Sequence, residues 1–145
     1  MSRTARETVE AFLASITTRD KLIDFYAPDV VIERPYAPAT LRRSEGLEIL
    51  RQGITRAADL YTLDKTDNVV LHETADPEVI IAEYDVHCRV VATQKDFVAS
   101  FIMVLRVRDG LIVHSRDYNN PLASAAALGT TPDQLAAMLL DEEHG

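Results

Sequence analysis

The chain has 145 residues, of which 47% are hydrophobic and 26% charged, and its formal net charge is −8 at pH 7. This length suits a single domain with a substantial core, while the acidic balance disfavours binding to nucleic acid or to anionic membranes. A lone cysteine excludes an internal disulfide, and no apolar run approaches the ~18 residues of a membrane span. We therefore expect a cytoplasmic protein that binds neither nucleic acid nor membranes.

The first half of the chain reads mainly as helix. Apolar residues recur at helical spacing in three segments, residues 4–18, 21–26 and 44–58. Ala27-Pro28-Asp29 should end the second helix before an extended run over residues 30–34, and a proline-containing loop follows over residues 35–40. Ser44 and Glu45 should open the third helix.

The second half is rich in valine and isoleucine and reads as strands over residues 68–74, 78–92, 97–108 and 111–119. Short turns separate these strands, among them Asp109-Gly110, which is typical of a tight hairpin. Pro121 then starts helix, and a capped helix over residues 131–140 should dock on its own or a partner subunit.

These elements predict one α+β domain over residues 1–145. Residues 1–58 should be mostly helical, residues 66–119 mostly strand, and residues 121–141 should form C-terminal helices. The sequential strands form an antiparallel meander, and the early strand over residues 30–34 makes the sheet mixed. Three helices are expected to pack on one face of this sheet.

Alternation along the strand around Tyr84 separates an apolar face from a polar one. The apolar face comprises Ile80, Ala82, Tyr84, Val86, Cys88 and Val90, and the polar face comprises Glu83, Asp85, His87 and Arg89. The first face belongs to the core. The second is either a solvated or dimer-facing surface or a functional lining, and His87 is a possible site residue only on the latter interpretation.

The sequence lacks the spacing that metal or cofactor sites require. The four histidines are scattered, and we find no HExxH, no CxxC pair, no GxSxG elbow and no glycine-rich phosphate loop. We therefore expect neither a metal nor another cofactor.

Asp117, near the end of the last strand, is the most informative residue. Leu111, Val113, Ser115 and Asp117 share one strand face, which should point toward the helices. A carboxylate withdrawn from water has a raised pKa and can act as a general acid or base near neutral pH. The alternative is a surface aspartate that pairs with Arg116 or caps the following helix.

Several segments resemble the nuclear transport factor two-like superfamily. Residues 9–16, 25–38 and 44–52 are similar to its first helix, its passage from helix to strand and its third helix. Residues 68–87 and 106–129 resemble SnoaL-like polyketide cyclases and PhzA/PhzB-type proteins, with Asp117, Tyr118, Asn120 and Pro121 matching their acid-aromatic-x-Asn-Pro run. The resemblance covers nearly the whole chain. It implies a cone-shaped α+β barrel, in which a curved, mostly antiparallel sheet wraps around three N-terminal helices and a short C-terminal helix follows.

The PhzA/PhzB group places a glutamate at the position of Asp117, where it is the acid/base of an amine-ketone condensation. Aspartate keeps that chemistry but reaches one methylene less far, so the substrate or its placement should differ. The histidine that the group carries near its second strand is replaced within residues 63–69.

Ketosteroid isomerases share this fold, but their reacting groups are replaced here. Arg34 occupies the position of their general-base aspartate, and Phe12 that of their oxyanion tyrosine. Met103 lies near the position of their protonated aspartate. The resemblance therefore implies that the ketosteroid isomerase mechanism is excluded. Phe12 and Met103 become candidates for the wall of a substrate pocket.

Arg34 and its neighbour Glu33 compete for the pocket, because a regular strand turns only one of two adjacent side chains inward. An inward Arg34 would hold a substrate carboxylate or an enolate with its planar guanidinium, and Glu33 is the other possible site residue. Tyr36, Tyr84 and Ser115 complete the expected substrate-binding set.

Two classes of function fit these residues. The first is a cofactor-free enzyme that cyclises, isomerises or condenses a small apolar or aromatic metabolite, with Asp117 moving a proton while Arg34 or Tyr84 holds an oxyanion. The second is a non-catalytic ligand-binding or dimerisation module of the same fold. An Asp117 inside a closed apolar cavity favours the enzyme, whereas a solvent-facing Asp117 favours the module. We expect a homodimer through the polar sheet face.

Overall fold

A computed structural model describes residues 3–140, so His144 and both ends of the predicted domain lie outside the described residues. The helices are α1 (Ala5–Ala14), α2 (Arg19–Leu22), α3 (Leu47–Leu60), α4 (Pro121–Ala127) and α5 (Pro132–Leu140), with 3-10 turns η1 (Ile23–Phe25) and η2 (Ala39–Leu41). The strands are β1 (Tyr26–Glu33), β2 (Arg43–Glu45), β3 (Tyr61–Glu73), β4 (Val79–Val90), β5 (Asp96–Arg108) and β6 (Leu111–Asn119).

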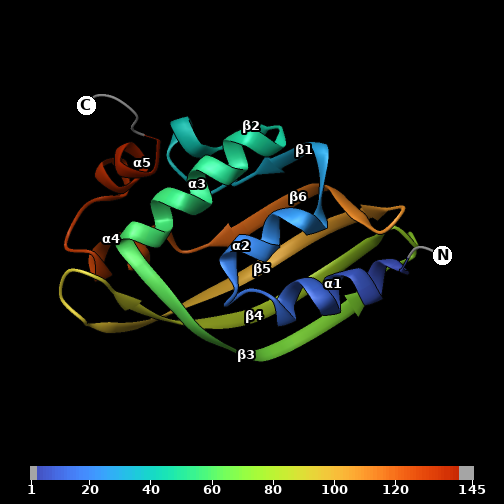
Figure 1. The fold of residues 1–145 in the computed structure, drawn as a ribbon, viewed down its shortest axis with the longest axis horizontal. Coiled ribbons are helices and arrows are strands. Elements are labelled where there is room, and N and C mark those ends of the chain that lie inside the picture. The colour runs from blue at the N-terminus through green and yellow to red at the C-terminus, as the bar shows by residue number, and fades with distance from the viewer. Residues whose placement is uncertain (1–2, 141–145) are drawn as a thin grey trace.

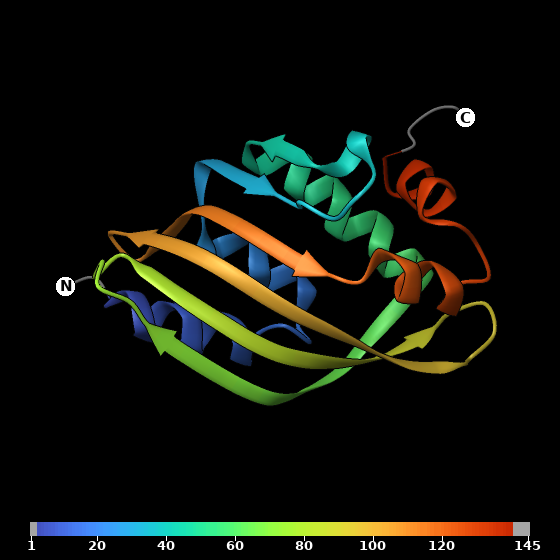
Figure 2. The same cartoon turned by 180° about the vertical axis from the view of Figure 1, so that it is seen from behind.

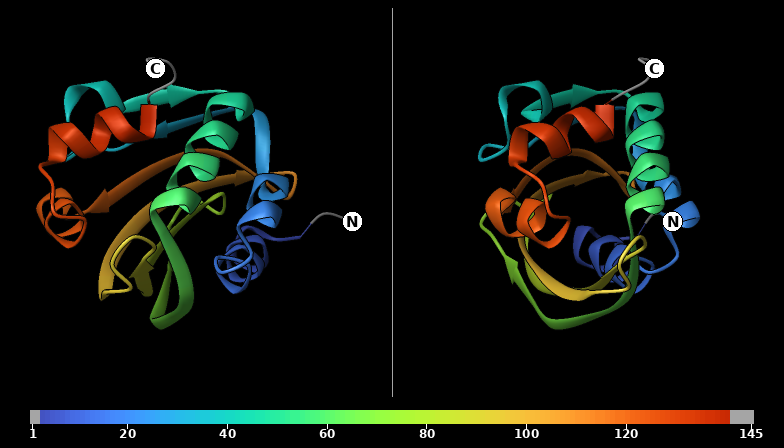
Figure 3. Two further views of the ribbon diagram at one scale, coloured as in Figure 1. Left: turned by 60° about the vertical axis from the view of Figure 1, so that its left-hand side comes forward. Right: turned by 90° about the vertical axis from the view of Figure 1, so that its left-hand side faces the viewer.

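The strands form one sheet in the order β2-β1-β6-β5-β4-β3 (Figure 1). The sheet curves around the N-terminal helices, which lie on its concave side (Figure 2), and the view along the molecule shows α1 held inside that curve (Figure 3). Because β2 and β3 are free edges, the sheet stays open instead of closing into a complete barrel. The predicted α+β class with a curved mixed sheet is confirmed in this open form.

The predicted meander is confirmed, since β3, β4, β5 and β6 pair antiparallel in sequence order. Only the pairing of β1 with β6 is parallel within the described sheet, and it makes the sheet mixed. Asp109 and Gly110 have φ values of 54° and 77°. Two successive residues of positive φ are what a tight hairpin turn requires, so the turn is where the sequence predicts it.

The first two helices are shorter than predicted, since α1 ends at Ala14 and α2 at Leu22. Three further boundaries differ from the predictions. β1 begins at Tyr26, so Pro28 lies inside the strand. Proline has no N–H to donate to a neighbouring strand, and it is tolerated here because the pairing with β6 is irregular between Tyr26 and Val31. Ser44 and Glu45 belong to the short strand β2 and do not open a helix; α3 starts after Gly46, whose φ of 91° suits glycine. β3 starts at Tyr61 because its polar first half pairs with the end of β4.

The inner face of the sheet carries the core, and β4 alternates as predicted. Ile80, Ala82, Tyr84, Val86, Cys88 and Val90 are all buried. In β6 the prediction was correct for Ser115 but wrong for Leu111 and Val113. A bulge leaves Val113 without a partner, so Ile112 pairs with Val107 and takes the buried position.

The C-terminal helices close one end of the molecule (Figure 3). Asn120 Oδ1 caps α4 by accepting hydrogen bonds from the backbone N–H groups of Leu122 at 3.0 Å and Ala123 at 3.3 Å. Thr131 caps α5 as predicted, accepting from the N–H of Gln134 at 3.2 Å. α5 docks against α3 and α4. No helix within residues 3–140 is long and apolar enough to cross a membrane.

Candidate functional site

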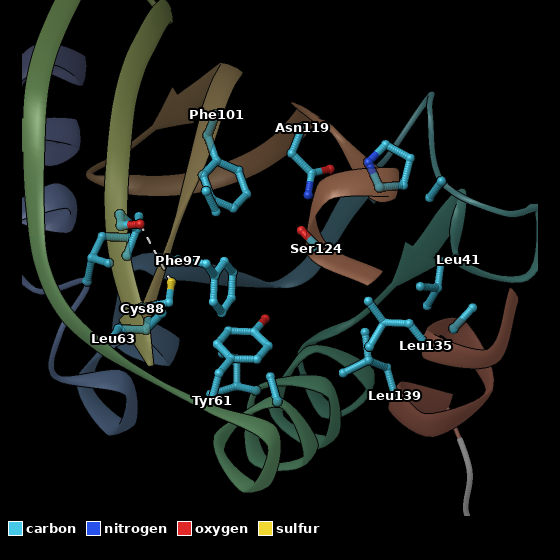
Figure 4. Close-up of a pocket in the computed structure, with 18 of the residues that line it drawn as sticks. Leu41, Tyr61, Leu63, Cys88, Phe97, Phe101, Asn119, Ser124, Leu135 and Leu139 are labelled. Carbon is cyan, nitrogen blue, oxygen red and sulfur yellow. Dashed lines mark hydrogen bonds between the residues drawn. The ribbon is translucent and has the colours of Figure 1, made fainter. Parts of the chain in front are cut away.

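An apolar cavity of about 260 Å³ lies between the inner face of the sheet, α3 and the C-terminal helices (Figure 4). Strands β3, β4 and β5 contribute wall residues Leu63, Val86, Cys88, Phe97 and Phe101. Helix α5 closes the opposite side with Leu135 and Leu139. The cavity therefore exists only because the C-terminal helices fold back over the concave sheet. Its lining suits a small apolar or aromatic molecule.

Cys88 is part of this wall and not a nucleophile. The residue is 2% exposed, and burial raises the pKa of its thiol to about 11. Since the thiolate is the reactive form, the protonated thiol serves as an apolar wall group.

Tyr84 lines the cavity from β4. Its ring stacks on Phe101 with centroids 5.3 Å apart, and its hydroxyl donates a hydrogen bond to Met103 Sδ at 3.0 Å. Burial and the negative charge of Asp117 raise the pKa of Tyr84 far above its ordinary value. The phenol therefore remains protonated and can act as a hydrogen-bond donor, but not as a base.

Asp117 lies on the inner side of β6, where the hydroxyl of the fully buried Ser115 donates a hydrogen bond to Asp117 Oδ1. Burial raises the pKa of Asp117, against the opposing effects of the Ser115 hydrogen bond and of the charges on Arg34 and His114. Asp117 neither pairs with Arg116 nor caps a helix, because Asn120 caps α4. Asp117 does not itself line the cavity; Tyr84 does.

Arg34 follows the end of β1, beside Asp117. Ile32 pairs with Ser115 and Glu33 with Arg116, so the next residues along these parallel strands, Arg34 and Asp117, face the same inner side. Arg34 Nη1 donates to the carbonyl oxygen of Leu41 at 3.3 Å. The choice that the sequence left open is thus resolved in favour of Arg34 as the inward residue.

Arg34 lines a second pocket of about 890 Å³, between α3 and the segment that contains η2 and β2. This pocket and the apolar cavity share the lining residues Leu41, Ile54, Ala57, Tyr61 and Leu139. The two spaces therefore adjoin, with Arg34 on the far side of the shared wall.

Tyr84 alone of the predicted set lines the cavity: besides Asp117 and Arg34, and the buried Ser115 and Met103, four more predicted residues lie elsewhere. Phe12 is a core residue, 2% exposed, and its ring meets those of Phe25 and Tyr26 edge to face. Tyr36 is 65% exposed and contacts Tyr118, with ring centroids 5.6 Å apart. Tyr36 leaves the strand direction because residues 35–36 form a turn after β1.

The other two, His87 and Glu33, lie on the outer face of the sheet. His87 Nε2 is 3.4 Å from Asp67 Oδ2, and Glu33 Oε1 is 2.7 Å from His114 Nε2. Both point outward because their strand neighbours Val86, Cys88 and Ile32 are buried on the inner face. Among residues 3–140, no group of three or more His, Cys, Asp or Glu side chains is arranged to hold a metal ion.

Sequence reasoning missed several polar groups of the cavity. Arg19, Tyr61, Asn119 and Ser124 line it, and their side chains have no hydrogen-bond partner among the described residues. Figure 4 shows Tyr61 on one side of the cavity and Asn119 and Ser124 on another. Arg19 and Ser124 lie more than a hundred residues apart in the chain, so no local pattern reveals that they meet at one cavity.

Fold and cavity together define a class of small α+β proteins in which a curved sheet and its helices enclose an apolar cavity. Residues 7–115 match the model of the SnoaL-like domain, and the chain belongs to this family, within the nuclear transport factor two-like superfamily.

An uncharacterized PhzA/B-like protein of Pseudomonas aeruginosa is 39% identical over 109 residues, which cover 73% of this chain and 75% of that protein. The crystal structure of a proposed isomerase from Bacillus subtilis superposes with a TM-score of 0.80 at 31% identity, covering 88% of this chain and 94% of that one. A proposed polyketide cyclase from Xanthomonas campestris shares the fold, with a TM-score of 0.73 at 22% identity, over 86% and 96% of the two chains.

Proposed function

We propose that the protein binds a small apolar or aromatic metabolite in the cavity and catalyses cofactor-free proton transfer during a cyclisation, isomerisation or condensation. Asp117 is the acid/base and Tyr84 the donor to a developing oxyanion. One observation carries this proposal: Tyr84 lines the cavity and is close enough to Asp117 for the charge of that carboxylate to raise the pKa of the phenol.

The raised pKa values divide the two roles. Since burial raises the pKa of Asp117, its carboxylate is a stronger base than an exposed aspartate and can take a proton from a carbon next to a carbonyl group. The phenol of Tyr84, with its pKa raised well above its ordinary value, stays neutral and donates to the enolate oxygen in place of Met103 Sδ. The positive charge of Arg34 acts in the opposite direction and limits the rise in the pKa of Asp117.

The similar structures support the reaction class. The Bacillus subtilis protein is a proposed isomerase and the Xanthomonas campestris protein a proposed polyketide cyclase. Both kinds of reaction can proceed through an enolate, which a base and an oxyanion donor suffice to form.

Exchange of hydrogen for solvent deuterium in an aromatic ketone tests the proposal. We expect the protein to catalyse deuterium uptake from D₂O at the carbon between the ring and the carbonyl of 2-tetralone, followed by NMR. Asp117→Asn should abolish this activity, and Tyr84→Phe should lower it roughly 10²-fold, as expected for loss of an oxyanion donor. Asp59→Asn, a change on the exposed side of α3, is the matched control. An Asp117→Asn variant that exchanges at the wild-type rate would contradict the assignment.

A ligand-binding module without turnover is the second candidate. The observation that favours it is that Asp117 does not line the cavity and is already hydrogen-bonded to Ser115. Tight binding of 2-tetralone by the wild-type protein without any deuterium uptake would support this candidate over the enzyme.

We also propose that two copies pair through the outer face of the sheet. Ile102, Val98 and Val70 on this face are 45%, 50% and 48% exposed. Charged groups between them are already paired, for example His72 Nε2 with Glu83 Oε2 at 2.6 Å. Covering such a surface with a second copy costs little free energy, because its charged groups keep their partners while its apolar side chains leave water.

A further inference from the structure

Arg19 places a positive charge at the wall of a mainly apolar cavity. It is the first residue of α2, is partly buried and lines the cavity wall. Its Cζ atom lies 4.9 Å from the centroid of the Tyr61 ring, so the guanidinium rests over that ring. Arg19 forms no ion pair and no hydrogen bond with the residues that the structure describes.

The absence of a carboxylate partner distinguishes Arg19 from most other arginines in the chain. A carboxylate lies within ion-pair distance of each of Arg6, Arg43, Arg51, Arg89, Arg106 and Arg108. A guanidinium remains protonated in proteins, and a charge withdrawn from water without a partner is costly. Burial accordingly lowers the pKa of Arg19. An anion brought into the cavity would relieve this cost.

The surroundings of Arg19 suit a carboxylate. Stacking on Tyr61 occupies the face of the guanidinium and leaves its N–H edge free for two parallel hydrogen bonds. Tyr61 adds a hydroxyl without a partner among the described residues, and burial raises the pKa of Tyr61, so this hydroxyl remains a donor. Figure 4 shows the Tyr61 ring projecting into the cavity.

The cation lies at the opposite end of the cavity from the proposed chemistry. Cys88 lies close enough to Arg19 for each to affect the other's pKa, and Tyr84 is four residues back on the same face of β4. At about 3.3 Å per residue, roughly 13 Å of strand separates these two ends. A molecule held at Arg19 would therefore present its far end to Tyr84.

We propose that the ligand is an aromatic carboxylic acid whose carboxylate is bound by Arg19 and Tyr61 and whose reacting carbonyl group lies at the Tyr84 end. The inference rests on the proposed function, since it names the substrate class of the same cavity. Arg19 is then the residue that selects acids over neutral molecules of the same shape.

Two probes that differ only in charge test this selection. 2-Naphthoate and 2-naphthamide have the same aromatic body, and their affinities can be measured by isothermal titration calorimetry. We expect Arg19→Gln to weaken naphthoate binding at least tenfold, as for a lost hydrogen bond to a charged group, and to change naphthamide binding less than twofold. Lys21→Gln is the matched control, because it removes the same charge from an exposed position of α2 that does not line the cavity.

The outcomes separate the inference from the proposed function. If wild type, Arg19→Gln and Lys21→Gln all bind acid and amide equally well, the inference is overturned while the cavity remains a ligand site. An equal loss of both probes in Arg19→Gln also overturns it, because it indicates that Arg19 only supports the wall. If the wild-type protein binds neither probe, the cavity takes no aromatic ligand and the proposed function fails together with the inference.

Discussion

Filling the cavity is the most direct test that the space is open and takes ligands. Ala99 lies on the inner face of β5, opposite Val86 and between the rings of Phe97 and Phe101. In Ala99→Leu, three added carbon atoms would enter a space of about 260 Å³. At about 0.8 kcal/mol for each buried carbon group, less about 0.5–1 kcal/mol for the fixed leucine rotamer, the free energy of unfolding should rise by about 1.5 kcal/mol.

Urea unfolding followed by circular dichroism measures this change, and calorimetry with 2-naphthamide should show weaker binding in the same variant. Val91→Leu is the matched control, since its side chain is 43% exposed just after β4 and is not part of the proposed pairing face; its stability should stay within about 0.5 kcal/mol of wild type. If Ala99→Leu is destabilised by 1 kcal/mol or more, as overpacked cores are, the space is not open and the reasoning is refuted.

Three further predictions concern charge and assembly. Burial raises the pKa of Asp117 above 3.8 in the folded state, so the ionised carboxylate destabilises the fold above that pH. We therefore expect Asp117→Asn to melt at a higher temperature than wild type at pH 7, and at the same temperature at pH 3, where both side chains are neutral. Hydrogen bonds from Arg108 and Arg106 lower the pKa of Glu78 from 4.5 to about 2. The ionised Glu78 therefore stabilises the fold fully above pH 4.5, and this stabilisation is lost as the pH falls toward 2. The melting temperatures of wild type and Glu78→Gln should converge over that range. Ile102→Asp places a charge on the outer face, and light scattering at micromolar concentration should find wild-type dimers and variant monomers; monomeric wild type would refute the pairing.

The sequence predicts those parts of the fold that depend on local pattern. Alternation around Tyr84 identifies the buried face of β4, and Asp109-Gly110 identifies the hairpin, because both signals lie within a few neighbouring residues. β2 escapes prediction, since three residues are too few to show a period and become a strand only by pairing with β1. The bulge at Val113 also escapes, because it arises from the match between two strands.

The candidate site, too, could be predicted only in part from the sequence. Strand periodicity and family resemblance together are enough to bring Asp117, Ser115 and Met103 to the inner face. They do not show that Tyr84, and not Asp117, reaches the cavity wall, because that depends on how the stacked rings of Tyr84 and Phe101 fill the space. Nor do they reveal Arg19, which comes to the cavity through the packing of α2 near the ends of β3 and β4.

The parallel pairing of β1 with β6 has a consequence for biosynthesis. Arg34 and Asp117 become neighbours only when the last strand is laid beside the first, so the pair cannot form on a nascent chain until residues 111–119 have left the ribosome. Until then the inner side of Ile32 lacks its neighbour Ser115, and contacts this distant in sequence form slowly. Synthesis of the final strand and the helices after it is therefore the step that creates the cavity, and a chain stopped before β6 would expose apolar surface that favours aggregation.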